Sequence, residues 1–351
     1  MQENPKAYAC IMAGGSGERF WPMSRRHTPK HLLKLFSDRT LVEETVRRLE
    51  GVVPLKNVFV LTNAAQLAGT RAALPFLPPE QIIAEPAKRD TAPAAALATA
   101  LVRARDPDGV LALLSADALI KDSAAFGRQL AAALQRAAQT DALLTFAIKP
   151  SHPATGFGYL EMAETLGGGF RRVARFVEKP DLATAQGYVA SGNHAWNAGM
   201  FAWRVSAFLA EAERQAPMLA QFIREFPAGN ASAYLAAKFP TLEPKVSLDY
   251  AIMEKARVVE TLVAEFDWDD VGTWTALPAH LPKDAGGNTV RGPVIVHESC
   301  NNIVLSSGRV VALCGVQDLV VVETPDAVLV CHRDAVQEIK KLIPQLPPEL
   351  L

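Results

Sequence analysis

The chain has 351 residues, and its 36 Lys and Arg against 37 Asp and Glu give a formal net charge of -1. This balance argues against a nucleic-acid coat or a polybasic membrane-binding surface. The four cysteines have no CxxC spacing and the seven histidines form no HExxH, which argues against structural zinc and against a disulfide framework. The amino terminus holds no apolar run long enough for a signal peptide, and no segment approaches the about 20 apolar residues of a membrane span. We therefore expect a cytoplasmic protein with no nucleic-acid or membrane partner.

In the first half of the chain, short apolar runs alternate with segments of helical period. Apolar runs predict strands, and apolar residues that recur at helical spacing predict helices. Strands are predicted at 8–13, 57–62, 81–84 and 110–115, and helices at 40–49, 64–74, 92–105 and 123–139. This alternation predicts a mainly parallel sheet covered on both faces. Because ligands bind beyond the carboxyl ends of such strands, residues 14–19, Glu85-Pro86 and Asp117 should lie at one rim.

After Pro150 the segments become shorter and mixed. We predict strands that start near Tyr159 and at 175–179 and 197–203, and helices at 181–190, 205–215, 217–225 and 247–255. A loop rich in acids and Trp, FDWDDVGTW, occupies 266–274.

The Gly- and Pro-rich stretch 282–292 is the best boundary candidate, and it divides the chain into domains 1–282 and 283–351. Beyond it, β-rich runs return every eight to eleven residues and a helix follows at 335–342. Such close spacing predicts a small all-β module, either a β-solenoid or a compact sheet. No catalytic group is apparent in this module, so we expect it to serve in assembly or as a lid.

The segment 8–30, YACIMAGGSGERFWPMSRRHTPK, places a glycine-rich turn before a dense group of cations. Glycines allow backbone N–H groups to approach phosphate oxygens closely, and Arg19, Arg25, Arg26 and Lys30 bring positive charge to the same turn. The spacing excludes a Walker A loop and a dinucleotide fingerprint, because Phe20 stands where the latter needs its third glycine. The pattern predicts a triphosphate site. The alternative is an ordinary strand-to-helix turn with surface arginines.

Three carboxylates are candidates for a magnesium site, since Mg²⁺ commonly takes one or two carboxylates together with phosphate oxygens and water. Asp117 follows a predicted strand, and Asp269 and Asp270 lie in the acidic loop. Taken alone, Asp117 suits a helix N-cap or a turn equally well, and the acids of the loop suit a solvated surface.

Two further segments have polar groups that suit a sugar phosphate. Glu178 could accept sugar hydroxyls while Lys179, on the opposite side of a strand, stays free for phosphate; an exposed strand end with ordinary charges is the alternative. Asn197 suits a hydroxyl-rich ligand, but Asn before Ala-Gly is also ordinary turn chemistry. We assign no role to His27, His31 or His152.

Eight motifs in order along nearly the whole chain resemble those of bacterial mannose-1-phosphate guanylyltransferases (GDP-mannose pyrophosphorylases), within the sugar nucleotidyltransferases. The motifs are AGGSGERFWPMSRRHTPK, EPAKRDTAP, SAD, GFGYL, FVEKP, WNAGMF, SLDYAIMEK and DWDDVGTW. The resemblance implies an α/β, Rossmann-like nucleotidyltransferase domain with a mixed, mainly parallel sheet and a small C-terminal left-handed β-helix-like module. It also implies Mg²⁺-dependent transfer of GMP from GTP to mannose 1-phosphate, with release of pyrophosphate.

The resemblance also implies roles for individual residues. Arg19 and Lys30 would neutralise phosphate charge, Asp117 and Asp270 would hold Mg²⁺, and these four form the catalytic set. The nucleotide-binding residues would be Ala13, Gly14, Gly15, Gly17, Glu85, Pro86, Thr91 and Ala92. The sugar-phosphate-binding residues would be Gly158, Glu178, Lys179 and Asn197.

The chain departs from the family pattern at two positions, with Ala118 where His is frequent and Asp90 where Asn is usual. Asp90 could accept from guanine N–H groups or cap the following helix. Two other functions stay open: a related enzyme that uses a heptose 1-phosphate or a different NTP, and a non-catalytic nucleotide-sugar sensor. The sequence does not fix the oligomeric state, so a homodimer also stays open.

Overall fold

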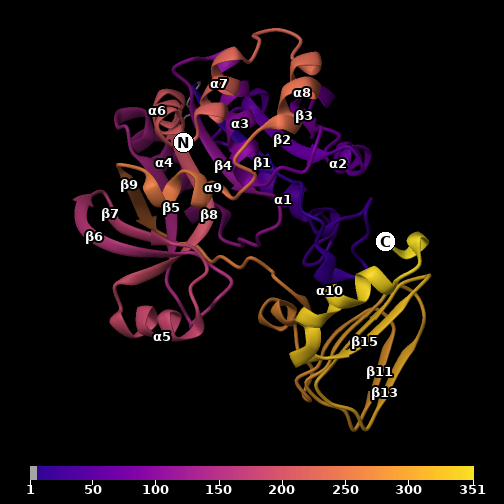
Figure 1. The fold of residues 1–351 in the computed structure, drawn as a ribbon. Coiled ribbons are helices and arrows are strands. Elements are labelled where there is room, and N and C mark those ends of the chain that lie inside the picture. The colour runs from indigo at the N-terminus through magenta and orange to yellow at the C-terminus, as the bar shows by residue number, and fades with distance from the viewer. Residues whose placement is uncertain (1–5) are drawn as a thin grey trace.

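The computed structural model describes residues 6–351; residues 1–5, part of the amino terminus for which we expected no signal peptide, lie outside this range. Its larger domain is built on a nine-stranded sheet in the order β3-β2-β1-β4-β8-β5-β9-β7-β6 (Figure 1). The strands are β1 (Ala7–Met12), β2 (Val58–Asn63), β3 (Ile82–Glu85), β4 (Val110–Ser115), β5 (Leu143–Ile148), β6 (Tyr159–Gly167), β7 (Phe170–Val177), β8 (His194–Arg204) and β9 (Val259–Val263).

Helices cover both faces of this sheet, as the alternation along the sequence predicts. Along β1 the side chains of Tyr8 and Cys10 join one buried apolar cluster and those of Ala9 and Ile11 join another, because successive residues of a strand face opposite sides. The helices are α1 (Leu41–Arg47), α2 (Leu67–Ala73), α3 (Thr91–Arg105), α4 (Ser123–Gln139), α5 (Leu182–Ser191), α6 (Val205–Gln215), α7 (Pro217–Glu225), α8 (Ser232–Lys238) and α9 (Leu248–Ala251). The cluster of Tyr8 includes α3, α6 and α7, and that of Ile11 includes α1 and α4.

The sheet is mixed, because β8 returns antiparallel between β4 and β5. The strands β1 to β4 are parallel to one another, and β5 pairs parallel with β9. We predicted no strand at β5 or β9 and no helix at α8. The predicted helix at 247–255 consists of the short α9 and a separate 3-10 turn at Met253–Lys255.

Strand register brings the predicted rim together. Met12 at the end of β1 pairs with Ser115 at the end of β4, and the Ala116 N–H donates to the Met12 carbonyl at 3.0 Å. Glu85 ends β3, two strands away from β1 in the same parallel set. The glycine loop, Glu85 and Asp117 therefore leave the same edge of the sheet.

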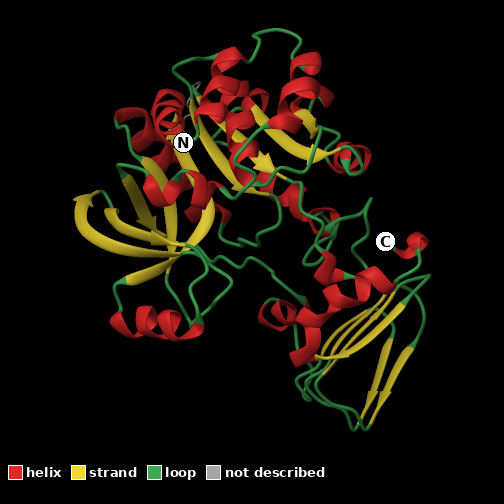
Figure 2. Cartoon of the chain, viewed as in Figure 1, coloured by secondary structure: helices red, strands yellow, loops and turns green. Residues whose placement is uncertain are grey.

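The C-terminal module is a stack of short strands (Figure 2). Parallel pairing joins β10 (Thr289–Arg291), β12 (Ile303–Ser306) and β14 (Leu319–Glu323) in one face and β11 (Val294–His297) and β13 (Val311–Cys314) in another. Strand β15 (Val328–His332) closes the first face antiparallel, and α10 (Ile339–Leu342) follows. Strand β10 lies inside the stretch 282–292 that we predicted as the domain boundary.

A third apolar cluster joins the module to the glycine loop of the large domain. Phe20 and Trp21, directly after the loop, are buried together with Trp274, Val336 and Ile339. The module is therefore packed against the segment that carries the predicted phosphate site. No helix among residues 6–351 combines the length and apolar character needed to cross a membrane.

Candidate active site

The glycine loop is held against Lys30 by a close backbone approach. Gly17 has φ of 63°, and a Cβ atom there would lie 2.3 Å from the Lys30 Cβ. Only glycine tolerates both this conformation and this contact. The Ser24 hydroxyl donates to the Gly17 carbonyl at 2.8 Å, which fixes the turn from the other side.

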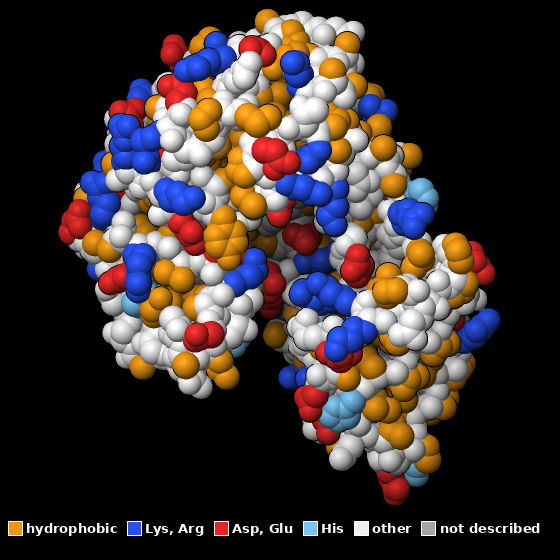
Figure 3. All heavy atoms as spheres, in the orientation of Figure 1, with side chains coloured by type: hydrophobic (Ala, Val, Ile, Leu, Met, Phe, Trp, Pro, Cys, Tyr) orange, Lys and Arg blue, Asp and Glu red, His pale blue; other side chains and the backbone are white. Residues whose placement is uncertain are grey.

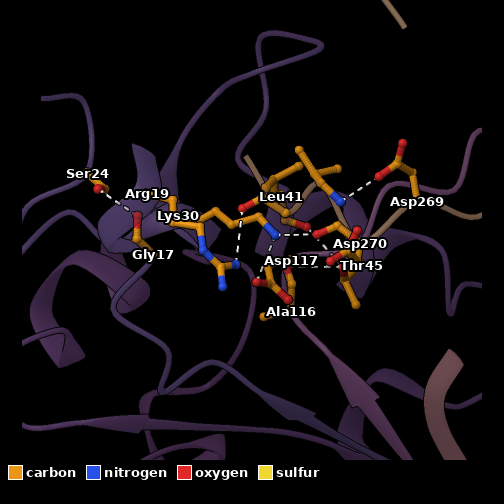
Figure 4. A network of polar contacts seen from close by, with 12 residues as sticks. Gly17, Arg19, Ser24, Lys30, Leu41, Thr45, Ala116, Asp117, Asp269 and Asp270 are labelled. Carbon is orange, nitrogen blue, oxygen red and sulfur yellow. Dashed lines mark hydrogen bonds and ion pairs between the residues drawn. The ribbon is translucent and has the colours of Figure 1, made fainter. Parts of the chain in front are cut away.

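Lys30 joins two segments that are remote in sequence (Figure 4). Lys30 is 7% exposed, and its Nζ donates to Asp117 Oδ2 at 3.0 Å and to the Asp270 carbonyl at 2.5 Å. Arg19 donates to the Gly272 carbonyl at 3.4 Å, so a second cation of the loop reaches the acidic segment. The loop, the end of β4 and the acidic segment therefore form one site.

A short antiparallel bridge between Leu119 and Asp269 joins the segment that carries Asp117 to the segment that carries Asp270. Each residue donates its N–H to the other's carbonyl, at 2.8 and 3.0 Å. Asp267 adds to this connection by accepting from the N–H groups of Lys121 and Asp122. The helix-cap alternative for Asp117 is wrong, because Asp122 caps α4 by accepting from the Ala125 N–H at 2.9 Å.

The structure also separates the roles of Asp269 and Asp270. Asp269 is engaged on both oxygens, accepting from the Val271 N–H and pairing with His280 Nε2, each at 2.7 Å. Asp270 instead lines a cavity that Asp117 also lines. Burial raises the pKa of Asp270, Lys30 opposes that shift, and Asp269 and Asp117 add to it.

Two cavities of about 430 and 600 Å³ meet at the end of β4. Both are lined by Lys30, Ser115 and Asp117. Figure 3 shows this part of the surface hollowed between the large domain and the C-terminal module, with acidic and basic side chains gathered around it. A ligand of two parts could thus lie with its halves in different cavities and its reacting atoms beside Lys30.

The smaller cavity ends among polar groups suited to a sugar. Asn197 is 8% exposed; its Nδ2 donates to Asp249 Oδ1 at 3.1 Å, and its Oδ1 accepts from Thr145 at 2.6 Å. A Cβ on Gly158 would lie 2.6 Å from Glu178 Oε2, so glycine is required beside this carboxylate. Burial raises the pKa of Asp249 to about 7, with a further contribution from Glu178. Asn197 lies within β8, and its Oδ1 also accepts from the Gly199 N–H at 3.3 Å, so the turn chemistry expected of Asn before Ala-Gly is present beside the contacts that suit a ligand.

The larger cavity combines the glycine loop with Glu85 and the start of α3. Burial raises the pKa of Glu85 to about 7. Asp90 caps α3 by accepting from the Thr91 N–H at 2.8 Å, and the Thr91 hydroxyl accepts from the Leu248 N–H at 2.8 Å. Asp90 also lines the cavity, so its role as a helix cap does not exclude contact with a ligand.

Most residues of the predicted site line one of the two cavities, and three do not. Gly17, Arg19, Gly158, Glu178, Asn197 and Asp270 line the smaller, Ala13, Gly14, Gly15, Glu85 and Thr91 line the larger, and Lys30 and Asp117 line both. Ala92 is fully buried in the apolar core, while Pro86 and Lys179 are exposed and line neither.

The free ammonium expected at Lys179 is not found, because its Nζ pairs with Glu178 Oε1 at 2.5 Å. Strand β7 ends at Val177, and Lys179 has φ of 47°. Glu178 and Lys179 therefore lie outside the strand, where side chains would alternate between opposite faces. Their side chains contact each other instead.

Several residues that line the cavities received no role from the sequence. Among them are Asp249, Trp268 and Lys340 in the smaller cavity and His31 in the larger. Asp249 and Trp268 lie within motifs that carry the family resemblance, so a signal existed for them. His31 is 2% exposed, and burial lowers its pKa to about 4, so its imidazole is neutral near pH 7. No local pattern marks Lys340.

Comparison with known proteins agrees with this geometry. Residues 8–285 match the nucleotidyl transferase family, and residues 292–346 match the MannoseP isomerase/GMP-like beta-helix domain. These matches confirm the predicted fold class.

Curated relatives match nearly the whole chain. The xanthan biosynthesis protein XanB of Xanthomonas campestris is 38% identical over 96% of this chain and 72% of its own length. The mannose-1-phosphate guanylyltransferase of Escherichia coli K12 is 38% identical over 97% of this chain and 73% of its own length. A solved structure from Thermus thermophilus, described as mannose-1-phosphate geranyltransferase, has a TM-score of 0.88 at 34% identity and covers 97% of this chain and 99% of its own. The chain belongs to the mannose-1-phosphate guanylyltransferase family of nucleotidyltransferase enzymes.

Proposed function

We propose that this enzyme transfers GMP from GTP to α-D-mannose 1-phosphate and forms GDP-mannose and pyrophosphate. The observation that carries the proposal is the meeting of two cavities at Lys30 and Asp117. One cavity offers hydroxyl-binding groups, and the other offers a glycine loop and the half-buried carboxyl of Glu85 for a nucleoside. The names of the relatives support the same pair of substrates.

In the proposed reaction an oxygen of the sugar phosphate attacks the α-phosphorus of GTP in line. The bond from the α-phosphorus to the oxygen that bridges to the β-phosphate breaks, and pyrophosphate leaves with that electron pair. A phosphate monoester is largely ionised near neutral pH, so the step needs no protein nucleophile and little help from a base. Lys30 stabilises charge on the reacting phosphates, and the loop N–H groups hold the nucleotide in position.

Asp117 and Asp270 fit a magnesium ion in the donor atoms they offer. Mg²⁺ is commonly held by one or two carboxylates together with substrate phosphate oxygens and water. Two carboxyl groups at one cavity match that requirement, and no group of three or more His, Cys, Asp or Glu suited to a metal occurs within residues 6–351. The ion would supply charge neutralisation on the phosphate oxygens.

Glu85 is proposed to select guanine. Its carboxylate could accept from the N1–H and N2–H of that base, a pair of donors that adenine lacks at the same edge. Gly14 lies beside it, since a Cβ at this position would be 3.6 Å from Glu85 Oε2. Asp90 lines the same cavity and is proposed to make a second acidic contact.

A panel of four NTPs against mannose, glucose and heptose 1-phosphates tests the proposal, with pyrophosphate release and product mass as readouts and Mg²⁺ present. We expect GTP with mannose 1-phosphate to give the highest kcat/KM and a product with the mass of GDP-mannose. A higher kcat/KM with a heptose 1-phosphate or another NTP would assign a different substrate. Tight GTP binding without any pyrophosphate release would favour the non-catalytic sensor.

A further inference from the structure

The C-terminal module contributes a cation to the smaller cavity. Lys340 of α10 lines this cavity together with Ser16, Gly17, Glu18 and Arg19. The sequence predicted an assembly or lid role for the module and no chemistry within it. The side chain lies instead at the phosphate-binding loop of the other domain.

Buried apolar contacts fix the position of α10. Ile339, next to Lys340, is 1% exposed and shares one apolar cluster with Phe20 and Trp21. The helix packs on the 3-10 turn Glu18–Phe20, which contains Arg19, and Figure 1 shows α10 beside this indigo segment. The Trp21 Nε1 also donates to the Leu350 carbonyl at 3.0 Å. The backbone of α10 is thus fixed beside the turn that contains Arg19.

The ammonium of Lys340 has no protein partner. Within residues 6–351 it forms no hydrogen bond and no ion pair, whereas the neighbouring Lys341 pairs with Glu338. Glu18, the acidic residue of the loop that also lines this cavity, accepts from the Ser16 hydroxyl at 3.1 Å. An exposed cation that lines a cavity without a partner is available to an anionic ligand.

The geometry of an in-line displacement indicates which part of the substrates Lys340 would contact. The sugar phosphate approaches from the end formed by Glu178, Asn197 and Asp249, and the reacting phosphorus lies beside Lys30. The leaving group departs on the side opposite to the attacking oxygen. Lys340 lies near Arg19, because α10 packs on the 3-10 turn Glu18–Phe20, so these two cations are the candidates for contact with the leaving group.

We propose that Lys340 binds the β- and γ-phosphates of GTP and the pyrophosphate they become, so that the C-terminal module completes the leaving-group site. The assignment rests on the proposed function. Arg19 and Lys340 then approach the same anion from two domains, and the module has a direct part in substrate binding.

The test compares Lys340→Met with Lys341→Met, a matched control one residue further along α10 that removes the same charge outside the cavity. In the reverse reaction, from GDP-mannose and pyrophosphate, K340M should raise the KM for pyrophosphate about tenfold, which corresponds to about 1.4 kcal/mol. The KM for GDP-mannose should stay within about twofold of wild type, and Lys340→Arg should restore most of the pyrophosphate affinity. The difference between wild type and K340M should shrink at high salt, because the side chain is exposed.

Calorimetric titration with inorganic pyrophosphate measures binding at the leaving-group site without turnover, so its result does not depend on the proposed function. If the wild type catalyses no exchange, the proposed function fails, and weaker pyrophosphate binding by K340M than by K341M still supports the leaving-group site. Equal pyrophosphate affinity in K340M, K341M and wild type overturns the assignment, as does a wild type that binds no pyrophosphate. Matching thermal midpoints for the variants and wild type exclude a folding defect as the cause.

Discussion

Lys30 Nζ lies 3.0 Å from Asp117 Oδ2, although 87 residues separate the two in the chain. The contact is made where the glycine loop folds back on the end of β4, and the same ammonium also donates to the Asp270 carbonyl. One side chain thus joins the three segments that form the proposed reaction centre.

Replacing Lys30 by Met should lower kcat at least about 100-fold, because a preorganised donor at developing charge is typically worth two to three orders of magnitude. The fold should persist, as the side chain's aliphatic volume is kept. Steady-state kinetics with GTP and mannose 1-phosphate measure the effect, and circular dichroism checks the fold. Lys34→Met is the control, since Lys34 is exposed and lines neither cavity. A K30M enzyme with near-normal turnover would exclude the role.

Asp270→Asn and Asp269→Asn should separate metal binding from loop structure. D270N removes a carboxylate from the cavity, so the Mg²⁺ concentration for half-maximal activity should rise about tenfold or more. D269N instead weakens the contact with His280, so it should lower the free energy of unfolding by about 1–3 kcal/mol. Magnesium titration and urea denaturation of both variants distinguish the two effects. Equal magnesium requirements for D270N and wild type would contradict the assignment.

Asp249→Asn should change how stability depends on pH. The folded-state pKa of Asp249, about 7, lies above the ordinary value of 3.8, so the folded protein binds more protons than the unfolded chain between these pH values. Wild-type stability therefore carries a penalty that grows as pH rises from about 4 to about 7. The variant lacks this penalty and should gain up to about 2 kcal/mol relative to wild type between pH 5 and pH 8.

Denaturant unfolding of D249N at both pH values measures this difference. The variant keeps an oxygen for the Asn197 amide, so the hydrogen bond should survive. Glu80→Gln, at an exposed position, is the control and should show no such trend. A constant difference between D249N and wild type across this range would show that the folded-state pKa is not raised.

Ile339→Ala should destabilise the protein by about 2–4 kcal/mol, the usual cost of truncating a buried aliphatic side chain. Ile339 belongs to the cluster that supports Phe20 and Trp21, so GTP affinity should also fall. Chemical denaturation and nucleotide titration measure the two effects. Val328→Ala, at a side chain that is 53% exposed in the same module, should change neither quantity appreciably. If I339A lost stability but kept full GTP affinity, the module would not support the loop.

The sequence by itself determined the parts of the molecule that depend on local pattern. Apolar runs such as 110–115 predicted the parallel strands β1 to β4. The helices Val205–Gln215 and Pro217–Glu225 were predicted at their observed bounds. The glycine loop was recognisable because close phosphate approach needs residues without side chains. The ordered motifs then identified the family.

Only the tertiary structure decided which remote groups meet. The Leu119–Asp269 bridge joined the acidic loop to the segment after β4, and the end of β7 turned Lys179 towards Glu178. Lys340 reaches the loop because Ile339 is buried against Phe20, a contact between distant segments that no local spacing encodes. Periodicity reports which face of an element is buried, but not which segment covers it, and the partners of charged side chains follow from that packing.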